Sequence, residues 1–179
     1  MVIVPDHYGR TAAVYDLLYG ALGKDYAAEA QEVHELIQAR RPGARTLLDV
    51  GCGTGGHLRH LTRWYDAAGV DLEPSMLAQA RIHLPDTPLA EADMRSFDLD
   101  QQYDAVVCLF SAIGHLPSVE DLDAAVATMT RHLAPSGVLI VDGWILPQNW
   151  KGIIGTTSTP RRTRPRKWLA CGTPGASAM

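Results

Sequence analysis

The chain has 179 residues, the size of one domain, and 46% of them are hydrophobic while 20% are charged. No run is long and apolar enough to cross a bilayer, and the first residues lack the charged-then-apolar pattern of a signal peptide. The three cysteines, at positions 52, 108 and 171, are far apart and lack metal-ligand spacing, so disulfide stapling is not expected. A reducing cytoplasm is the expected location.

The net charge of −4 is unevenly distributed. All 20 acidic residues lie between Asp6 and Asp142, together with ten of the 16 basic residues, so this region carries −10. The other six basic residues follow Trp150 and have no acid among them. An acidic body disfavours a nucleic-acid-binding face, and neither nucleic acid nor a membrane is an expected partner.

Hydrophobic periodicity predicts alternating helices and strands. The predicted helices cover residues 11–22, 25–40, 57–65, 74–84 and 121–133. The predicted strands cover residues 45–50, 67–72, 88–93, 103–110 and 137–143. This order predicts an α/β fold in which a parallel sheet carries helices on both faces. Beyond Trp150 neither period continues, so residues 151–179 are predicted to be a basic, disordered tail after a domain of residues 1–150.

The segment "LLDVGCGTGGHLRHL", residues 47–61, places four glycines between a buried strand and a helix. Glycines let the chain turn tightly and approach a ligand closely, and the N-terminus of the next helix offers unpaired N–H groups. The loop satisfies two patterns. G-x-G-x-x-G is typical of dinucleotide binding, and D-x-G-x-G-x-G, which begins at Asp49, is typical of S-adenosylmethionine (SAM) methyltransferases.

Three acids bear on the choice of cofactor, and two of them, Asp49 and Asp93, favour SAM over a dinucleotide. Asp49 would repel a pyrophosphate, whereas a nearby acid favours the sulfonium and ammonium of SAM. Asp71 ends the second predicted strand, where a carboxylate can bind both ribose hydroxyls of either cofactor. Asp93 and Met94 follow the third strand, where an adenine edge would lie. The three acids in order, each at a strand end, are more specific than the glycine loop alone.

These motifs resemble the class I SAM-dependent methyltransferases. More narrowly, they resemble the N,N-dimethyltransferases of nucleotide-linked amino sugars in macrolide biosynthesis, of the desosamine and mycaminose type. The segments that carry the resemblance are residues 15–30, 47–61, 93–99, 110–116 and 132–144. The resemblance implies a Rossmann-like core over residues 45–146, a helical lid over residues 8–40, and transfer of a methyl group from SAM to the amino group of a dTDP-amino sugar in antibiotic biosynthesis. A homodimer is left open.

The resemblance also implies the residues around the cofactor. By it Tyr15 contacts SAM and Tyr8 lies on the substrate side. The complete expected set is Tyr15, Asp49, Gly51, Cys52, Gly53, Thr54, Gly55, Asp71, Leu72, Met76, Asp93, Met94 and Phe110.

The acceptor amine must lose its proton before it can accept a methyl group, and a histidine or tyrosine can accept or relay that proton. The candidate catalytic residues are His115, just past the fourth strand, and Tyr8. His57 and His60 lie three apart after the glycine loop, but no third ligand is near them. We expect a solvated helix face there and no metal.

The chain departs from the family pattern in places. It reads "DGWILPQNW" where the subgroup usually reads "EPWWFPE", which leaves the sugar open. Family members continue with an antiparallel sheet over the active site and two final core strands, which are expected to be missing here. Three alternatives therefore stay open: a SAM enzyme with an oxygen or carbon acceptor, an inactive SAM-binding product, and a nicotinamide-dependent reductase.

Overall fold

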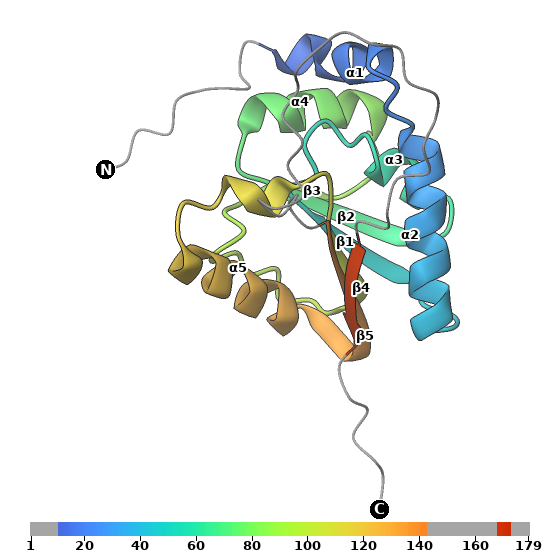
Figure 1. Cartoon of the computed structure of the whole chain (residues 1–179), viewed down its shortest axis with the longest axis vertical. Helices are drawn as coiled ribbons and strands as arrows, with labels where there is room; N and C mark the ends of the chain where they lie inside the picture. Colours follow the sequence, from blue (N-terminus) through green and yellow to red (C-terminus); the bar gives the residue numbers. More distant parts are fainter. Residues whose placement is uncertain (1–10, 143–167, 173–179) are drawn as a thin grey trace, which may run out of the picture.

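The computed structural model describes residues 11–142 and 168–172 (Figure 1). Its helices are α1 (Ala12–Ala21), α2 (Tyr26–Arg40), α3 (Leu58–Leu61), α4 (Pro74–His83) and α5 (Val119–Arg131), with a 3₁₀ helix η1 (Ala112–His115). Its strands are β1 (Thr46–Val50), β2 (Asp66–Asp71), β3 (Leu89–Glu91), β4 (Tyr103–Cys108), β5 (Leu133–Asp142) and β6 (Trp168–Gly172). None of the described helices is long and apolar enough to cross a membrane.

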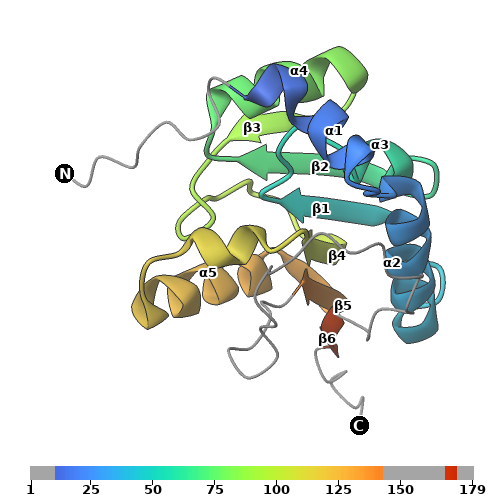
Figure 2. The same ribbon diagram turned by 45° about the horizontal axis from the view of Figure 1, so that its top comes forward.

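The strands form one sheet in the order β3-β2-β1-β4-β5-β6 (Figure 2). The first five are parallel, which confirms the predicted α/β fold. The chain order reverses between β1 and β4, because β2 and β3 extend to one side of β1 while β4 and β5 extend to the other. In open parallel sheets, ligands bind beyond the carboxyl ends of the strands at such a switch point.

Helices cover both faces of the sheet, as predicted, with α2 and α5 on opposite sides (Figure 1). One buried cluster joins α2, α3 and α4 to the side chains of Leu47, Val107 and Ile140. The other joins α5 and η1 to Leu48, Val106 and their neighbours on the opposite face. Successive residues of a strand point to opposite faces, so the apolar run of each central strand is buried twice.

The segment predicted as a helical lid divides into two parts. Helix α2 is a core element, because Ala30, Val33 and Ile37 are fully buried on its inner face. Helix α1 contacts α4, and Val14 and Leu17 on it are at least half exposed. The prediction of a lid is therefore wrong for α2 and stays a prediction for α1.

Several predicted boundaries differ from the structure, including one end each of α3, α5 and β5. Helix α3 ends at Leu61, not residue 65, because the chain continues through turns into β2. Helix α5 begins two residues early, because the Ser118 hydroxyl accepts the N–H of Asp121 and caps it. Strand β5 begins at Leu133, not residue 137, with Ser136 in the left-handed region (φ 60°) and a register shift against β4.

Strand β6 contradicts the prediction that residues 151–179 contain no regular structure. Trp168–Gly172 pairs antiparallel with β5, from Trp168 opposite Asp142 to Gly172 opposite Val138. The edge of β5 offers unpaired N–H and C=O groups, which can order a segment whose own sequence shows no period. One strand follows β5, so the described sheet is mixed; residues 143–167 and 173–179 lie outside the described part.

Candidate functional site

The carboxyl ends of β1 and β4 approach each other closely at the switch point. Gly51, just after β1, has φ 74°, and a Cβ there would lie 2.7 Å from the Cβ of Ala112 in η1. The same Cβ would lie 3.6 Å from the end of the Met94 side chain. Only glycine satisfies both the backbone conformation and this approach. The loop therefore lies between the segments that follow β3 and β4.

The glycine loop is held to β2 by its own backbone. The N–H groups of Gly51 and Cys52 both donate to the carbonyl of Val70, at 2.8 and 3.0 Å. The N–H of Gly53 donates to Asp71 Oδ2 at 2.7 Å. The site that a Cβ of Gly53 would occupy has no atom within 4 Å, so this part of the loop faces open space. The loop is pre-formed and leaves room for a ligand.

Two carboxylates lie beneath and beside this loop. Asp49 in β1 is 2% exposed, and its Oδ1 has no hydrogen-bond partner within the described residues. Burial, reinforced by the charge of Asp71, raises the pKa of Asp49 to about 7. Burial also raises the pKa of Asp71, although that carboxylate accepts the N–H groups of Gly53 and Glu73. A cationic ligand or further hydrogen-bond donors would therefore stabilise the ionised forms of Asp49 and Asp71.

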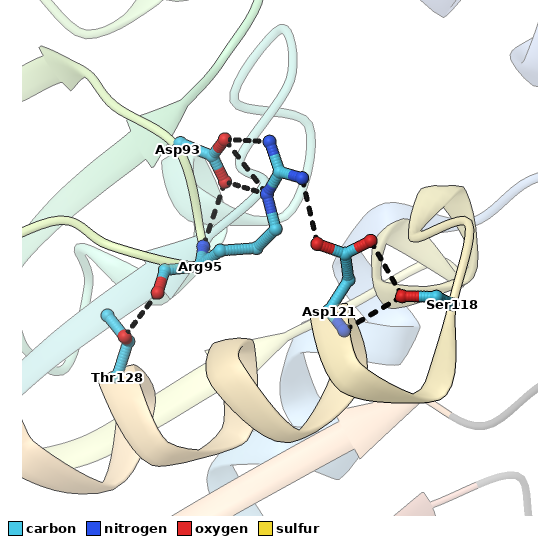
Figure 3. Close-up of polar contacts among 5 residues, drawn as sticks. All are labelled: Asp93, Arg95, Ser118, Asp121 and Thr128. Atoms are coloured by element: carbon cyan, nitrogen blue, oxygen red, sulfur yellow. Dashed lines mark hydrogen bonds and ion pairs between the residues drawn. The ribbon is translucent and has the colours of Figure 1, made fainter. Parts of the chain in front are cut away.

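A third carboxylate, Asp93, lies in a different environment (Figure 3). The backbone N–H of Ala92 donates to the Asp71 carbonyl, so Asp93 follows the neighbouring strand end. Arg95 grips the Asp93 carboxylate through Nε and Nη2 and bonds Asp121 of α5 through Nη1 at 2.9 Å. Hydrogen bonding from Arg95 lowers the pKa of Asp93. Asp93 is therefore ionised and already partly paired.

The chain after β4 is strained. Phe110 and Ser111 have φ values of 55° and 59°, a region that non-glycine residues seldom adopt. The Phe110 ring packs edge-on against Tyr19 of α1 with centroids 4.9 Å apart, and the Lys24 ammonium lies 3.6 Å from its centroid. Backbone strain of this kind is common at functional sites. It turns the chain across the ends of the strands toward η1.

Helix α1 is tied to the glycine loop by one short hydrogen bond. The Thr54 hydroxyl donates to Asp16 Oδ1 at 2.6 Å, and Thr54 is buried. Tyr15 lies one residue before Asp16, with its ring 4.6 Å from that of Tyr19. The side chain of Thr54 thus binds α1, and Tyr15 lies on the helix that covers the loop.

A charged cluster joins α2 to the start of α3. The Glu29 carboxylate accepts from Lys24 at 2.5 Å and lies 3.0 Å from His57 Nε2. Although burial opposes it, hydrogen bonds from His57 and Lys24 lower the pKa of Glu29 to about 2. His57 is buried, so the prediction of a solvated helix face is wrong for it, because α2 covers this side chain. The described residues contain no group of three or more side chains suited to hold a metal ion.

The remaining predicted residues are distributed unevenly around the site. His115 is exposed at the end of η1, and Leu72 is exposed just after β2. Met76 is buried on α4. The sulfur of Cys52 lies within the core beside Gly69, so only its backbone faces the loop. Tyr8 lies outside the described residues.

Residues 47–137 match the family model described as "Methyltransferase domain", which is about half of the chain. The chain belongs to this methyltransferase family. The match begins in β1 and ends in β5, so it includes the glycine loop and all three acids of the site.

Relatives of this methyltransferase include N,N-dimethyltransferases of dTDP-amino sugars. It is 49% identical over 140 residues to the dTDP-3-amino-3,4,6-trideoxy-alpha-D-glucopyranose N,N-dimethyltransferase of Streptomyces venezuelae, covering 78% of this chain and 59% of that protein. It is 44% identical over 146 residues to the dTDP-3-amino-3,6-dideoxy-alpha-D-glucopyranose N,N-dimethyltransferase of Streptomyces fradiae, covering 81% and 57%. The predicted resemblance is confirmed.

Solved structures agree with this methyltransferase fold. The SAM-bound amino pentose methyltransferase from Micromonospora echinaspora matches with a TM-score of 0.75 and 46% identity, over 76% of this chain and 58% of that one. The Rossmann-like fold is therefore confirmed. The chain spans less than two thirds of the length of each of these relatives.

Four residues of the site were not found from sequence. Asp16, Glu29, Arg95 and Asp121 each act across the fold: Thr54 is 38 positions from Asp16, His57 is 28 from Glu29, and Asp121 is 26 from Arg95. A charged residue on a helix face is usually solvated, so its position in the sequence does not indicate a role in the site. The near neighbours Asp93 and Arg95 are the one exception, because a two-residue spacing already allows their contact.

Proposed function

We propose that this protein binds SAM and methylates the amino group of a nucleotide-linked deoxyamino sugar in antibiotic biosynthesis. The observation that carries the proposal is the buried carboxylate of Asp49, whose Oδ1 has no hydrogen-bond partner in the described part of the chain, beneath a glycine loop that is open at Gly53. The class of acceptor follows the printed activities of the relatives.

The charges and hydrogen-bond acceptors of the site fit SAM. Asp49 and Asp71 provide negative charge where a cationic methionyl group would lie, and Gly53 presents a face with no side chain. Asp71 would bind the ribose hydroxyls with the acceptor capacity that its two backbone N–H donors leave. Asp93 would meet the adenine edge. When bound, SAM supplies an activated methyl group whose departure leaves a neutral thioether.

The protein's own residues would orient and deprotonate the acceptor. The strained turn at Phe110 directs η1 across the strand ends, and His115 ends that helix in an exposed position. We assign His115 the role of accepting the ammonium proton of the sugar, since a protonated amine has no lone pair for methyl transfer. Holding the amine in line supplies much of the rate, because proximity is worth up to about 7–11 kcal/mol.

A nicotinamide dinucleotide fits the same loop less well. Its pyrophosphate would lie at the N-terminus of the helix after the loop, near Asp49 and Asp71, whose pKa values are both raised by burial. Bringing further negative charge to this region opposes binding.

Calorimetric titration with S-adenosylhomocysteine and with NAD tests the cofactor. We expect saturable heat with S-adenosylhomocysteine and none with NAD. The opposite pattern would reject the proposal and favour the reductase.

Turnover assays test the acceptor and the role of His115. Amino-sugar and hydroxy-sugar nucleotides are offered side by side, and only the amino sugars should be methylated. For His115→Ala we expect kcat to fall by about 10²–10⁴-fold. His83→Ala, which changes a histidine at the end of α4, is the matched control and should leave kcat unchanged. Methylation of hydroxy sugars alone would reject the amine acceptor.

A further inference from the structure

We propose that Arg95 is a positioning residue that sets the nucleobase specificity of this site, by holding Asp93 so that it accepts one N–H from an amino-purine. The proposal rests on the proposed function, because it takes the adenine of SAM as the group that meets Asp93. Arg95 itself need not contact the cofactor.

The grip of Arg95 on Asp93 comes from two parts of the same residue (Figure 3). The backbone N–H of Arg95 donates to Asp93 Oδ1 at 2.9 Å. Its Nε lies 2.9 and 3.0 Å from Oδ1 and Oδ2, and its Nη2 lies 2.5 Å from Oδ2. A guanidinium forks across both oxygens of a carboxylate and fixes its plane.

These contacts leave Asp93 with little remaining capacity. An ionised carboxylate has about four lone-pair sites, and three donor hydrogens of Arg95 occupy three of them. About one acceptor position is left, with its direction set by the plane that Arg95 holds. A single N–H of an amino group matches that position, whereas a carbonyl oxygen would meet the carboxylate with like partial charge.

Arg95 is in turn fixed from the far side. Its Nη1 donates to Asp121 Oδ1 at 2.9 Å, and Asp121 Oδ2 accepts the Ser118 hydroxyl at 2.9 Å. Ser118 caps α5, so the rotamer of Arg95 is set by the N-terminus of that helix. Through Arg95 and Asp121, the orientation of the Asp93 carboxylate is therefore fixed relative to the start of α5.

The loop itself stays in place without the guanidinium. The Thr128 hydroxyl donates to the backbone carbonyl of Arg95 at 2.8 Å, and Arg131 donates to the carbonyl of Phe97 at 3.3 Å. Phe97 is buried against His132. The Arg95 side chain is 40% exposed, so its removal should free Asp93 to rotate without unfolding the loop.

Calorimetry with two ligands tests the proposal. The ligands are S-adenosylhomocysteine and S-inosylhomocysteine, its analogue with an oxygen in place of the amino group. The wild type should favour the amino ligand by roughly ten- to a hundredfold. Arg95→Met should reduce this ratio to within about threefold, and Arg95→Lys should restore it only in part, since lysine cannot fork across both oxygens.

Two further variants complete the set. Asp93→Asn should abolish the preference, because its amide can donate to the carbonyl oxygen. Arg63→Met, which removes an exposed arginine just after α3, is the matched control and should keep the wild-type ratio. Thermal melts run alongside should show all variants folded.

The outcomes separate this proposal from the function it rests on. If the wild type binds S-adenosylhomocysteine and Arg95→Met weakens both ligands equally or neither, Arg95 has only a structural role and the positioning proposal is rejected alone. An unchanged ratio in Asp93→Asn would reject Asp93 as the nucleobase contact. If the wild type binds neither ligand, both proposals fail.

Discussion

Two groups of acids lie at the same edge of this sheet in opposite physical states. Asp71 accepts the backbone N–H groups of Gly53 and Glu73, whereas Oδ1 of Asp49 has no hydrogen-bond partner within the described residues. Burial raises the pKa of each. Asp93 and Asp121 share one arginine near the surface, and hydrogen bonding from it lowers the pKa of each. Asp49, with a pKa of about 7, can change its protonation near neutral pH, whereas Asp93 and Asp121 stay charged there.

The difference separates two tasks of one binding site. A nearby cation favours the ionised form of a buried, partly protonated carboxylate. Binding of a cationic ligand is therefore linked to the ionisation of Asp49. A carboxylate already gripped by Arg95 gains little from further charge, and its remaining lone pair is useful for direction. The buried pair thus favours a cationic ligand, and the Arg95 network orients one hydrogen bond.

The largest expected effect is on stability, through Asp49→Asn. The folded pKa of about 7 exceeds the ordinary value of 3.8, so the folded state binds more protons between these values and loses stability as pH rises through them. The shift corresponds to about 4 kcal/mol in full. Relative to the variant, the wild type should lose up to about that much free energy of unfolding between pH 4 and pH 8, measured by urea denaturation without ligand. A difference that is constant with pH would show that Asp49 is ionised throughout.

Asp71→Ala should have the next largest effect, on cofactor binding. The variant removes the shared acceptor for the ribose hydroxyls and the bond from Gly53 that shapes the loop. Hydrogen bonds to a charged group are worth about 1.5–3 kcal/mol, so the dissociation constant of S-adenosylhomocysteine should rise more than tenfold. Asp66→Ala, at the amino end of the same strand, is the matched control and should bind as the wild type does. Equal affinities for all three proteins would remove Asp71 from the site.

Asp121→Asn should have the smallest effect and sharpens the contrast with the buried pair. Its contact with Arg95 is exposed, and exposed ion pairs contribute little to stability. We therefore expect an unchanged thermal midpoint and only a partial loss of selectivity for the amino-purine ligand, because Arg95 keeps its bonds to Asp93. A large fall in the midpoint would show that this network is a structural support of α5.

The helices, the first five strands and the acids at the strand ends could be predicted because each is indicated by residues close together in the sequence. Apolar runs and helical spacing fixed the order from β1 to β5, and Asp49, Asp71 and Asp93 each follow from a position relative to a strand. The sheet order then brings these three side chains to one edge, since parallel strands end on the same side.

The rest depends on contacts between distant segments. Strand β6 forms on an edge that β5 supplies, not on a pattern of its own. His57 is buried beside Glu29 of α2, and the Phe110 ring packs against Tyr19 of α1. Neither periodicity nor composition records which helix face meets which loop.

The most direct test of the account is proton release on cofactor binding. S-Adenosylhomocysteine is titrated into the wild type and into Asp49→Asn at pH 7, in two buffers of different ionisation enthalpy. With a pKa of about 7, Asp49 should release about half a proton as the ligand's ammonium draws it into the ionised form, and the variant should release none. Binding with the same heat in both buffers for the wild type would contradict the claim that Asp49 couples charge to binding.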